Sequence, residues 1–298
     1  MKIGFSLPQI GPQARAAARI PGFAAALEQA GADSFWVGDR LLAAVDPTVG
    51  YGGSDRIPAE FNQVLDPFLT LALAAAATER VRLGANVLIA PLYPPAVLAR
   101  ALTTLDVASG GRLRPGFGIG WSPEEYAAAG VPFSRRGARL EQTLDALEAI
   151  WTTDPAEYSG SLVSVPRHRA ELKPVQRPRP PILLGAFKPA ALERVGRRGD
   201  GWLPVVPVPG SPEWGARLRT LRGVVDRAAE QAGRDPAAIE TIVRVNVAAG
   251  TPLEQIAATV RRTAEQSDFD DFFLDLTYLS ASLDHALEDA HRLLELLA

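Results

Sequence analysis

Cysteine is absent from this chain of 298 residues. The protein therefore has no thiol for a disulfide, a thiolate nucleophile, a cysteine-based zinc site or an iron–sulfur cluster. Histidine is scarce as well, because only His168, His285 and His291 occur and none follows an expected strand. A barrel hydrolase that holds its metal through several histidines cannot be assembled from this set, so we expect no metal site.

The chain also has no large excess of charge of either sign, since 31 Lys and Arg residues nearly balance 34 Asp and Glu residues and leave a formal net charge of -3. This balance gives no field to hold nucleic acid or an anionic membrane, so we expect neither as a partner. No charge-free apolar run reaches about 18 residues, and no signal-peptide core follows Met1. We therefore expect a cytoplasmic protein, and its 47% hydrophobic residues suffice for a large core.

Short apolar runs of β-type composition alternate with longer amphipathic segments along the chain. Eight of these runs are expected as strands, each followed by a helix: residues 3–7, 34–37, 81–87, 113–119, 182–184, 202–203, 242–247 and 272–274. Strict alternation predicts a parallel sheet in an α/β fold, and eight units favour closure into a (β/α)8 TIM barrel. We predict a single domain over residues 1–298, with an open doubly wound sheet as the weaker alternative.

Two long connections interrupt this alternation. Residues 39–66 follow the second strand and should emerge at the C-terminal face of the barrel, where active sites are built. Residues 152–181 precede the fifth strand and follow a helix, so they should begin at the opposite end. Connections of this length are usually functional or separately folded. We expect the first insertion to be functional and the second to be mainly structural.

Lys188 is one of only three lysines, and it lies where a strand passes into a helix. It falls a few residues too late for a Schiff-base lysine in the barrel mouth. A cation at the first turn of a helix, here beside Pro189, is unfavourable unless an anion lies between the cation and the helix dipole. We therefore interpret Gly185, Ala186, Phe187 and Lys188 as a phosphate cradle; the alternative is that Lys188 extends into water.

A second helix start carries the same unfavourable charge. Ser134 is a good N-cap, yet Arg135 and Arg136 crowd the first turn and Arg139 follows one turn on. Two such starts on one face predict a ligand with several negative charges. The alternative is a solvated face whose arginines pair with nearby glutamates: Glu124, Glu125 or Glu141.

Three glycines, Gly116, Gly118 and Gly120, alternate along and just after the expected fourth strand. Their spacing differs from the dinucleotide fingerprint, and no helix starts directly after them. Glycines within a strand mark places where something flat or bulky approaches the backbone. Together with Gly84 and the small residues before Asn86, they predict a slot for a planar ring. The alternative is core packing against large neighbours.

Asp39 and Arg40 follow the second strand, which places a charged pair at the barrel mouth. An exposed ion pair contributes little to stability, so we interpret this pair as binding a ligand or anchoring a loop. Tyr51, Trp121 and Tyr126 are expected to add aromatic walls, the last two as cofactor contacts.

Taken together, these segments resemble the luciferase-like monooxygenase superfamily of flavin- and deazaflavin-dependent barrels. The resemblance runs over most of the chain, and its order and spacing are specific. It is carried by residues 31–40, 81–90, 105–112, 118–121, 181–185 and 199–204. Residues 39–53 look like an actinobacterial subgroup that uses coenzyme F420.

The resemblance implies a cofactor site. In the superfamily, a non-prolyl cis peptide backs the cofactor ring, and here it would join Asn86 and Val87. Gly118, Gly120 and Trp121 would lie along the ring and its side chain, and Asp39 would contact the ring or a loop. Residues 185–188 match the loop that holds the cofactor phosphate. Relatives are commonly dimers, so a homodimer is expected.

Arg40 departs from the family pattern, in which many members have histidine as proton donor or ring contact. Arginine stays protonated near neutral pH, but it can stabilise an anionic deazaflavin or an oxyanion. Our leading hypothesis is an oxidoreductase that transfers a hydride between coenzyme F420 and a small organic substrate. Arg40 would stabilise charge, and Glu124, Glu125 or Tyr51 would supply a proton. The alternatives are an FMN-dependent two-component luciferase-like monooxygenase and a non-catalytic flavin-binding protein.

Overall fold

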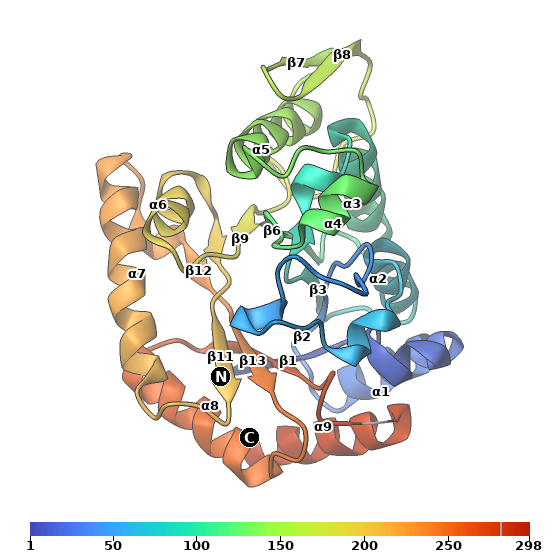
Figure 1. Cartoon of the computed structure of the whole chain (residues 1–298), viewed down its shortest axis with the longest axis vertical. Coiled ribbons are helices and arrows are strands. Elements are labelled where there is room, and N and C mark those ends of the chain that lie inside the picture. Colours follow the sequence, from blue (N-terminus) through green and yellow to red (C-terminus); the bar gives the residue numbers. More distant parts are fainter. Residues whose placement is uncertain (281) are drawn as a thin grey trace.

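The computed structural model describes residues 1–280 and 282–298. Strands lie at the centre and helices surround them, with both termini drawn in the lower part of the view (Figure 1). The helices are α1 (Ile20–Gln29), α2 (Pro67–Ala76), α3 (Pro95–Ala108), α4 (Pro123–Ala128), α5 (Arg136–Thr152), α6 (Pro189–Arg198), α7 (Trp214–Gln231), α8 (Leu253–Ser267) and α9 (Leu283–Leu297). Within the described ranges, no helix is both long and apolar enough to cross a membrane.

The central strands all pair in parallel. They are β1 (Lys2–Ser6), β2 (Ser34–Val37), β3 (Arg82–Ala85), β4 (Leu88–Ile89), β5 (Leu113–Arg114), β6 (Gly116–Gly118), β9 (Leu183–Leu184), β10 (Gly201–Trp202), β11 (Val205–Val208), β12 (Glu240–Thr241), β13 (Val243–Val247) and β14 (Asp271–Asp275). These bounds match the eight expected strand positions, several of which are split into two short pieces.

Two hydrogen-bonded sheets divide these strands. One has the order β11-β13-β14-β1-β2-β3-β5, and the other has the order β12-β10-β9-β6-β4. Four strand positions contribute to both sheets, because each is split into two short strands: β3 and β4, β5 and β6, β10 and β11, and β12 and β13. Neighbouring strands therefore follow the chain order around the centre, and the predicted (β/α)8 barrel is confirmed, although no single continuous ladder encloses it.

Large side chains fill the interior of the barrel. The rings of Trp36 and Phe273 stack with centroids 4.7 Å apart, and Leu183, Leu203 and Ile242 complete this inner cluster. Glycine on neighbouring strands makes the room they need, because a Cβ on Gly84 would overlap the indole of Trp36.

The glycines of the fourth strand have the same packing role. A Cβ on Gly116 would overlap the carbonyl oxygen of Ala85, and one on Gly118 would overlap the side chain of Val87. The part of the planar slot that we expected at Gly84, Gly116 and Gly118 is thus taken by protein atoms. Core packing, the alternative interpretation, is what the structure shows for these positions.

The start of α5 differs from the expected one. Arg135, not Ser134, occupies the N-cap position, and its φ of 63° places it in the left-handed region. Neither residue caps the helix with its side chain, since no side-chain cap hydrogen bond forms at this end. The chain therefore turns sharply at Arg135 before α5 begins, and the presence of Ser134 in the sequence did not predict this turn.

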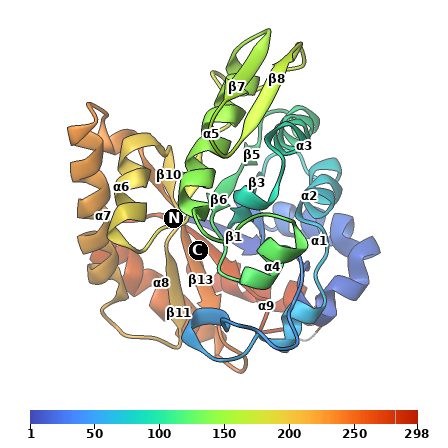
Figure 2. The same cartoon turned by 45° about the horizontal axis from the view of Figure 1, so that its top comes forward.

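The insertion before the fifth strand is anchored firmly to the barrel. It contains an antiparallel hairpin, β7 (Ala156–Ser159) and β8 (Ser164–His168), which projects beyond α5 (Figure 2). The buried carboxylate of Asp106 on α3 accepts hydrogen bonds from the backbone N–H of Val175, at 2.6 Å, and of Gln176, at 3.0 Å. These contacts agree with the structural role expected for residues 152–181.

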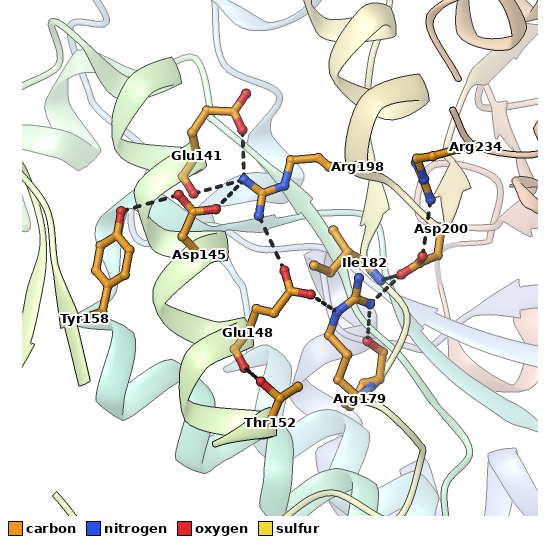
Figure 3. A network of polar contacts seen from close by, with 11 residues as sticks. Glu141, Asp145, Glu148, Thr152, Tyr158, Arg179, Ile182, Arg198, Asp200 and Arg234 are labelled. Carbon is orange, nitrogen blue, oxygen red and sulfur yellow. Dashed lines mark hydrogen bonds and ion pairs between the residues drawn. The ribbon is translucent and has the colours of Figure 1, made fainter. Parts of the chain in front are cut away.

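Ion pairs join the end of this insertion to the neighbouring helices (Figure 3). Arg198 of α6 pairs with Glu141, at 3.0 Å, and with Asp145, at 2.8 Å, both on α5. Arg179 pairs with Glu148 at 3.4 Å and with Asp200 at 2.5 Å. The network therefore fixes α5 and α6 side by side, with both helices starting at the end of the barrel where the strands finish.

Candidate active site at the barrel mouth

A cavity of about 180 Å³ opens at the C-terminal ends of the strands. Tyr51 and Phe61, from the insertion after β2, form part of its wall. It is lined by Ile10, Gly38, Asp39, Arg40, Tyr51, Phe61, Asn86, Val87, Ile89, Gly120, Trp121 and Arg244. Because active sites of (β/α)8 enzymes form at this face, the cavity is the candidate site.

The peptide bond between Asn86 and Val87 is cis, which confirms the prediction made from the family resemblance. It lies between β3 and β4, and both residues line the cavity. The backbone N–H of Asn86 donates to the carbonyl of Val37 at 2.8 Å, so the bulge is tied to β2. The side chain of Val87 fills the space that Gly118 and Gly185 leave open.

Asp39 is a nearly buried carboxylic acid on the cavity wall, with 9% of the residue exposed. The N–H of Ile89 donates to Oδ2 at 2.8 Å, and the hydroxyl of Tyr93 donates to both carboxylate oxygens at 3.0 Å. Burial raises the pKa of Asp39 to about 6, against the opposing effect of these hydrogen bonds. Asp39 can therefore change its protonation state near neutral pH.

Arg40 is held between an aromatic ring and an acid. Its guanidinium carbon lies 4.3 Å from the ring centroid of Trp121, and Nη2 lies 3.0 Å from Oε2 of Glu125. The side chains of Arg40 and Glu125 are 6% and 1% exposed, so little water screens this pair. Arg40 therefore fixes Trp121 in the cavity wall while Glu125 balances its charge.

Glu124 and Glu125 anchor the insertion after β2. The N–H of Leu41 donates to Oε1 of Glu125 at 2.7 Å, and the N–H of Thr48 donates to Oε1 of Glu124 at 2.8 Å. Burial raises the pKa of Glu125, whereas hydrogen bonds from Thr48 and Ser122 lower the pKa of Glu124 to about 2. Neither glutamate lines the cavity, so their geometry is that of loop anchors and not of the proton donors we expected.

The three aromatic residues expected as walls separate into two groups. Tyr51 and Trp121 line the cavity with ring centroids 5.6 Å apart. Tyr126 does not line it: the side chain is buried, its hydroxyl donates to the carbonyl of Ile119, and its ring packs edge-on against Phe133. The structure therefore does not bring Tyr126 to the cavity wall, and the cofactor contact expected from it stays a prediction.

The loop before α6 remains open to solvent. Gly185, Phe187 and Lys188 are exposed, while the carbonyl of Ala186 accepts a hydrogen bond from the indole N–H of Trp202 at 2.9 Å. Lys188 occupies the N-cap position of α6 and makes no salt bridge within the described residues. The phosphate cradle predicted here stays a prediction.

The arginines at the start of α5 are mostly engaged elsewhere. Arg139 donates to the carbonyls of Pro91, at 2.9 Å, and Leu162, at 2.8 Å. The guanidinium of Arg136 lies 3.9 Å from the ring centroid of Phe133. Arg135 alone of the three is left exposed without such contacts among the described residues, so most of the positive charge expected for a polyanionic ligand serves the fold.

Arg244, which lines the cavity, and its partner Asp275 are residues that sequence reasoning missed. Arg244 on β13 donates through Nε to Oδ2 of Asp275 at 3.0 Å, and Nη2 contacts the same oxygen. Although burial opposes ionisation, the charge of Arg244 and hydrogen bonds from Thr277 hold the pKa of Asp275 below its usual value. A signal was present: Arg244 is the charged residue in a valine-rich strand, and a charged residue in a buried strand needs a partner or a ligand.

The profile of the luciferase-like monooxygenase family matches residues 1–296, so the chain belongs to that family. Its curated relatives include a phthiodiolone/phenolphthiodiolone dimycocerosates ketoreductase of Mycobacterium tuberculosis. The two are 35% identical over 216 residues, which is 70% of this chain and 55% of that protein. An uncharacterised protein of the same species is 37% identical over 166 residues, covering 54% of this chain and 56% of that protein. The matches thus span about half the length of these relatives.

Solved structures share the fold over nearly the whole chain. The monooxygenase RslO1 from Streptomyces bottropensis has a TM-score of 0.76 at 21% identity and covers 99% of this chain and 97% of its own. An F420-dependent secondary alcohol dehydrogenase has a TM-score of 0.74 at 16% identity, with 100% and 99% covered. The oxygenating constituent of 3,6-diketocamphane monooxygenase from Pseudomonas putida, in complex with FMN, has a TM-score of 0.74 at 14% identity, with 100% and 96% covered. Neighbours of this fold therefore use either F420 or FMN.

Proposed function

We propose that this protein is an oxidoreductase that transfers a hydride between coenzyme F420 and a small organic substrate. The proposal rests on the cavity at the barrel mouth, which the Asn86–Val87 bulge backs and an acid with a pKa near neutrality lines. It is supported by an F420-dependent dehydrogenase of the same fold and by a relative named as a ketoreductase. Coenzyme F420, when bound, supplies the hydride chemistry.

The size of the cavity suits part of such a cofactor. Its volume of about 180 Å³ is below the roughly 300 Å³ at which pockets for drug-sized ligands begin, so it takes a ring system and not the entire molecule. Val87, Gly120 and Trp121 would hold the ring. The rest of the cofactor would lie outside the cavity, where Lys188 and the exposed backbone before α6 would receive its phosphate.

The protein residues around the cavity have separate tasks. Asp39 would accept or release the proton that accompanies hydride transfer, because its pKa lies near the working pH. Tyr51, Phe61 and Trp121 would exclude water from the reacting atoms. Arg40 would keep Trp121 in position, and its charge would favour a developing anion.

An FMN-dependent two-component monooxygenase is the second candidate. Solved monooxygenases share the fold as closely as the F420-dependent dehydrogenase does, and one of them was solved with FMN. A third hypothesis, a non-catalytic flavin-binding protein, predicts that no open cavity lies beside the reactive ring. Turnover with either reduced cofactor would exclude it.

Separate titrations of the cofactor-free protein with F420 and with FMN test the proposal. We expect micromolar binding of F420 and little affinity for FMN. Lys188→Ala should weaken F420 binding about tenfold, because a charged hydrogen bond to phosphate is lost. Lys2→Ala is the matched control, because it removes an exposed lysine at the start of β1, at the end of the barrel away from the cavity. Binding of FMN alone, with oxygen consumption by its reduced form, would favour the monooxygenase, and binding of neither would refute both.

A further inference from the structure

Arg244 occupies the floor of the cavity, at the point where two hollows meet. It lines the main cavity and also a smaller hollow of about 20 Å³ that Ser6, Trp36 and Asp275 help to form. Asn86 lines both hollows as well, and it arrives from β3, across the barrel from β13. Two polar side chains from different strands therefore face the same space.

The guanidinium of Arg244 is only partly used by the protein. Asp275 accepts from Nε and Nη2 through one oxygen, and its other oxygen accepts from the N–H of Thr277 at 3.0 Å. Among the described residues, no oxygen accepts a hydrogen bond from Nη1. The side chain of Arg244 is 18% exposed, and this remaining surface lies against the cavity.

Asn86 carries a second donor without a partner. Its Nδ2 is buried and makes no hydrogen bond to any described residue. A buried donor that stays unpaired is costly, so it is expected to meet an acceptor when the site is filled. Asp39, which lines the same cavity, accepts from Ile89 and Tyr93 and makes no hydrogen bond to Asn86.

The remaining wall restricts what such an acceptor can belong to. Ile10, Ile89, Phe61 and the rings of Tyr51 and Trp121 surround the polar floor with apolar surface. Spare donors within an apolar wall favour an oxygen acceptor attached to a small apolar group, and they disfavour an ammonium group.

We propose that Arg244 and Asn86 form an oxygen-binding subsite that selects substrates bearing a carbonyl or carboxylate oxygen on a small apolar group. This inference rests on the proposed function, since it names the class of substrate that the oxidoreductase would take. Asp275 is a positioning residue, because it holds the guanidinium of Arg244 by two of its nitrogens and leaves the third to the substrate.

Fluorine NMR titrations of the cofactor-free protein test the subsite directly. The probes are para-fluorobenzoate, para-fluoroacetophenone, para-fluorobenzylamine and para-fluorotoluene. We expect the benzoate and the ketone to bind and the amine and the hydrocarbon to bind far more weakly. Tighter binding of the benzoate would identify a carboxylate substrate, and tighter binding of the ketone would identify a carbonyl substrate.

Variants assign the binding to Arg244. Arg244→Met alone leaves the buried Asp275 without its partner, so the double variant Arg244→Met/Asp275→Leu, which removes both charges, is the safer test. It should weaken both oxygen-bearing probes about 10- to 100-fold, as expected for loss of a charged hydrogen bond. Arg222→Met, which removes a half-buried arginine paired with Asp226 on α7, is the matched control and should change neither.

Three outcomes with the control probes or the double variant would overturn the subsite. They are equal binding of the amine or the hydrocarbon, unchanged probe binding in the double variant, and loss of F420 affinity without loss of probe binding. The last would mean that Arg244 serves the cofactor. A wild-type protein that binds F420 and ignores both oxygen-bearing probes refutes the subsite alone. One that binds the probes and neither cofactor refutes the proposed function.

Discussion

Replacing Asp39 by asparagine should make the protein more stable than wild type at neutral pH. This advantage over wild type should shrink as the pH is lowered. In the folded protein, burial raises the pKa of this carboxyl from 3.8 to about 6. Between these two values the unfolded chain has released the proton while the folded protein still holds it. The contribution of Asp39 to stability is thus fully present below pH 3.8 and is lost as the pH rises through about 6.

The size of the effect follows from the two pKa values. A shift of about 2.2 units (6 minus 3.8) corresponds to about 3 kcal/mol, at about 1.4 kcal/mol per unit. Asparagine fits the same position, because its oxygen can accept from the N–H of Ile89 and its amide can donate to the hydroxyl of Tyr93. Asp39→Asn should therefore gain on wild type by as much as about 3 kcal/mol between acid and neutral pH.

Urea unfolding of both proteins, followed by tryptophan fluorescence at several pH values, measures this difference. Taking the difference between the two proteins cancels the titration of every group that they share. A difference that stays constant within about 1 kcal/mol across the range would show that Asp39 ionises as freely as in water. The variant should also lose turnover with F420, because asparagine cannot exchange a proton.

Three further substitutions test separate parts of the structure. Arg40→Lys should lower stability by about 1 kcal/mol in urea unfolding and weaken F420 binding, since an ammonium cannot stack as a planar guanidinium does; the exposed Arg56→Lys should do neither. Gly84→Ala should lower the free energy of unfolding by about 1–3 kcal/mol through overpacking, and a variant as stable as wild type would contradict this packing. Gly22→Ala, in open space on α1, should raise the free energy of unfolding by about 0.5–1 kcal/mol. Arg198→Ala should cost about 1 kcal/mol at low salt and less at high salt, with unchanged cofactor titrations; a loss of F420 binding would show that the helix network reaches the site.

Much of the fold could be predicted from the sequence, because the signals are local. Apolar runs such as residues 34–37 and 272–274 became β2 and β14, and Gly31, just after α1, has the positive φ of 102° that is typical of a glycine at a helix end. The glycines were harder to interpret. Gly84 and Gly118 were read as room for a ligand, whereas Trp36 and Val87 from other parts of the chain fill that room. The side chain that packs against a glycine comes from a distant part of the chain. The spacing of glycines along one strand therefore does not predict it.

The residues of the candidate site also fall into those that the sequence could predict and those that it could not. The position of Asp39 at a strand end and the cis peptide at Asn86 were accessible from local sequence and family resemblance. The pairing of Arg244 with Asp275 was not, because 31 residues separate them and only the register of β13 beside β14 brings them together. Glu125 was misjudged for a related reason. Its carboxyl group suggested a proton donor, and only the tertiary structure shows that it accepts a hydrogen bond from a backbone N–H group of the insertion after β2.

The insertion after β2 is held by hydrogen bonds near both of its ends. Glu124 and Glu125 hold its first residues, and Gln9 donates to the carbonyls of Gly38, at 2.9 Å, and Leu65, at 2.8 Å. The stretch from about residue 49 to residue 62, which carries Tyr51 and Phe61, lies between these fastenings. If the cavity binds the substrate as we propose, its preference can change by exchange of this segment, while Asp39 and the strands beneath it stay unchanged. Grafting the corresponding segment of a relative onto this scaffold should transfer preference without rebuilding the barrel.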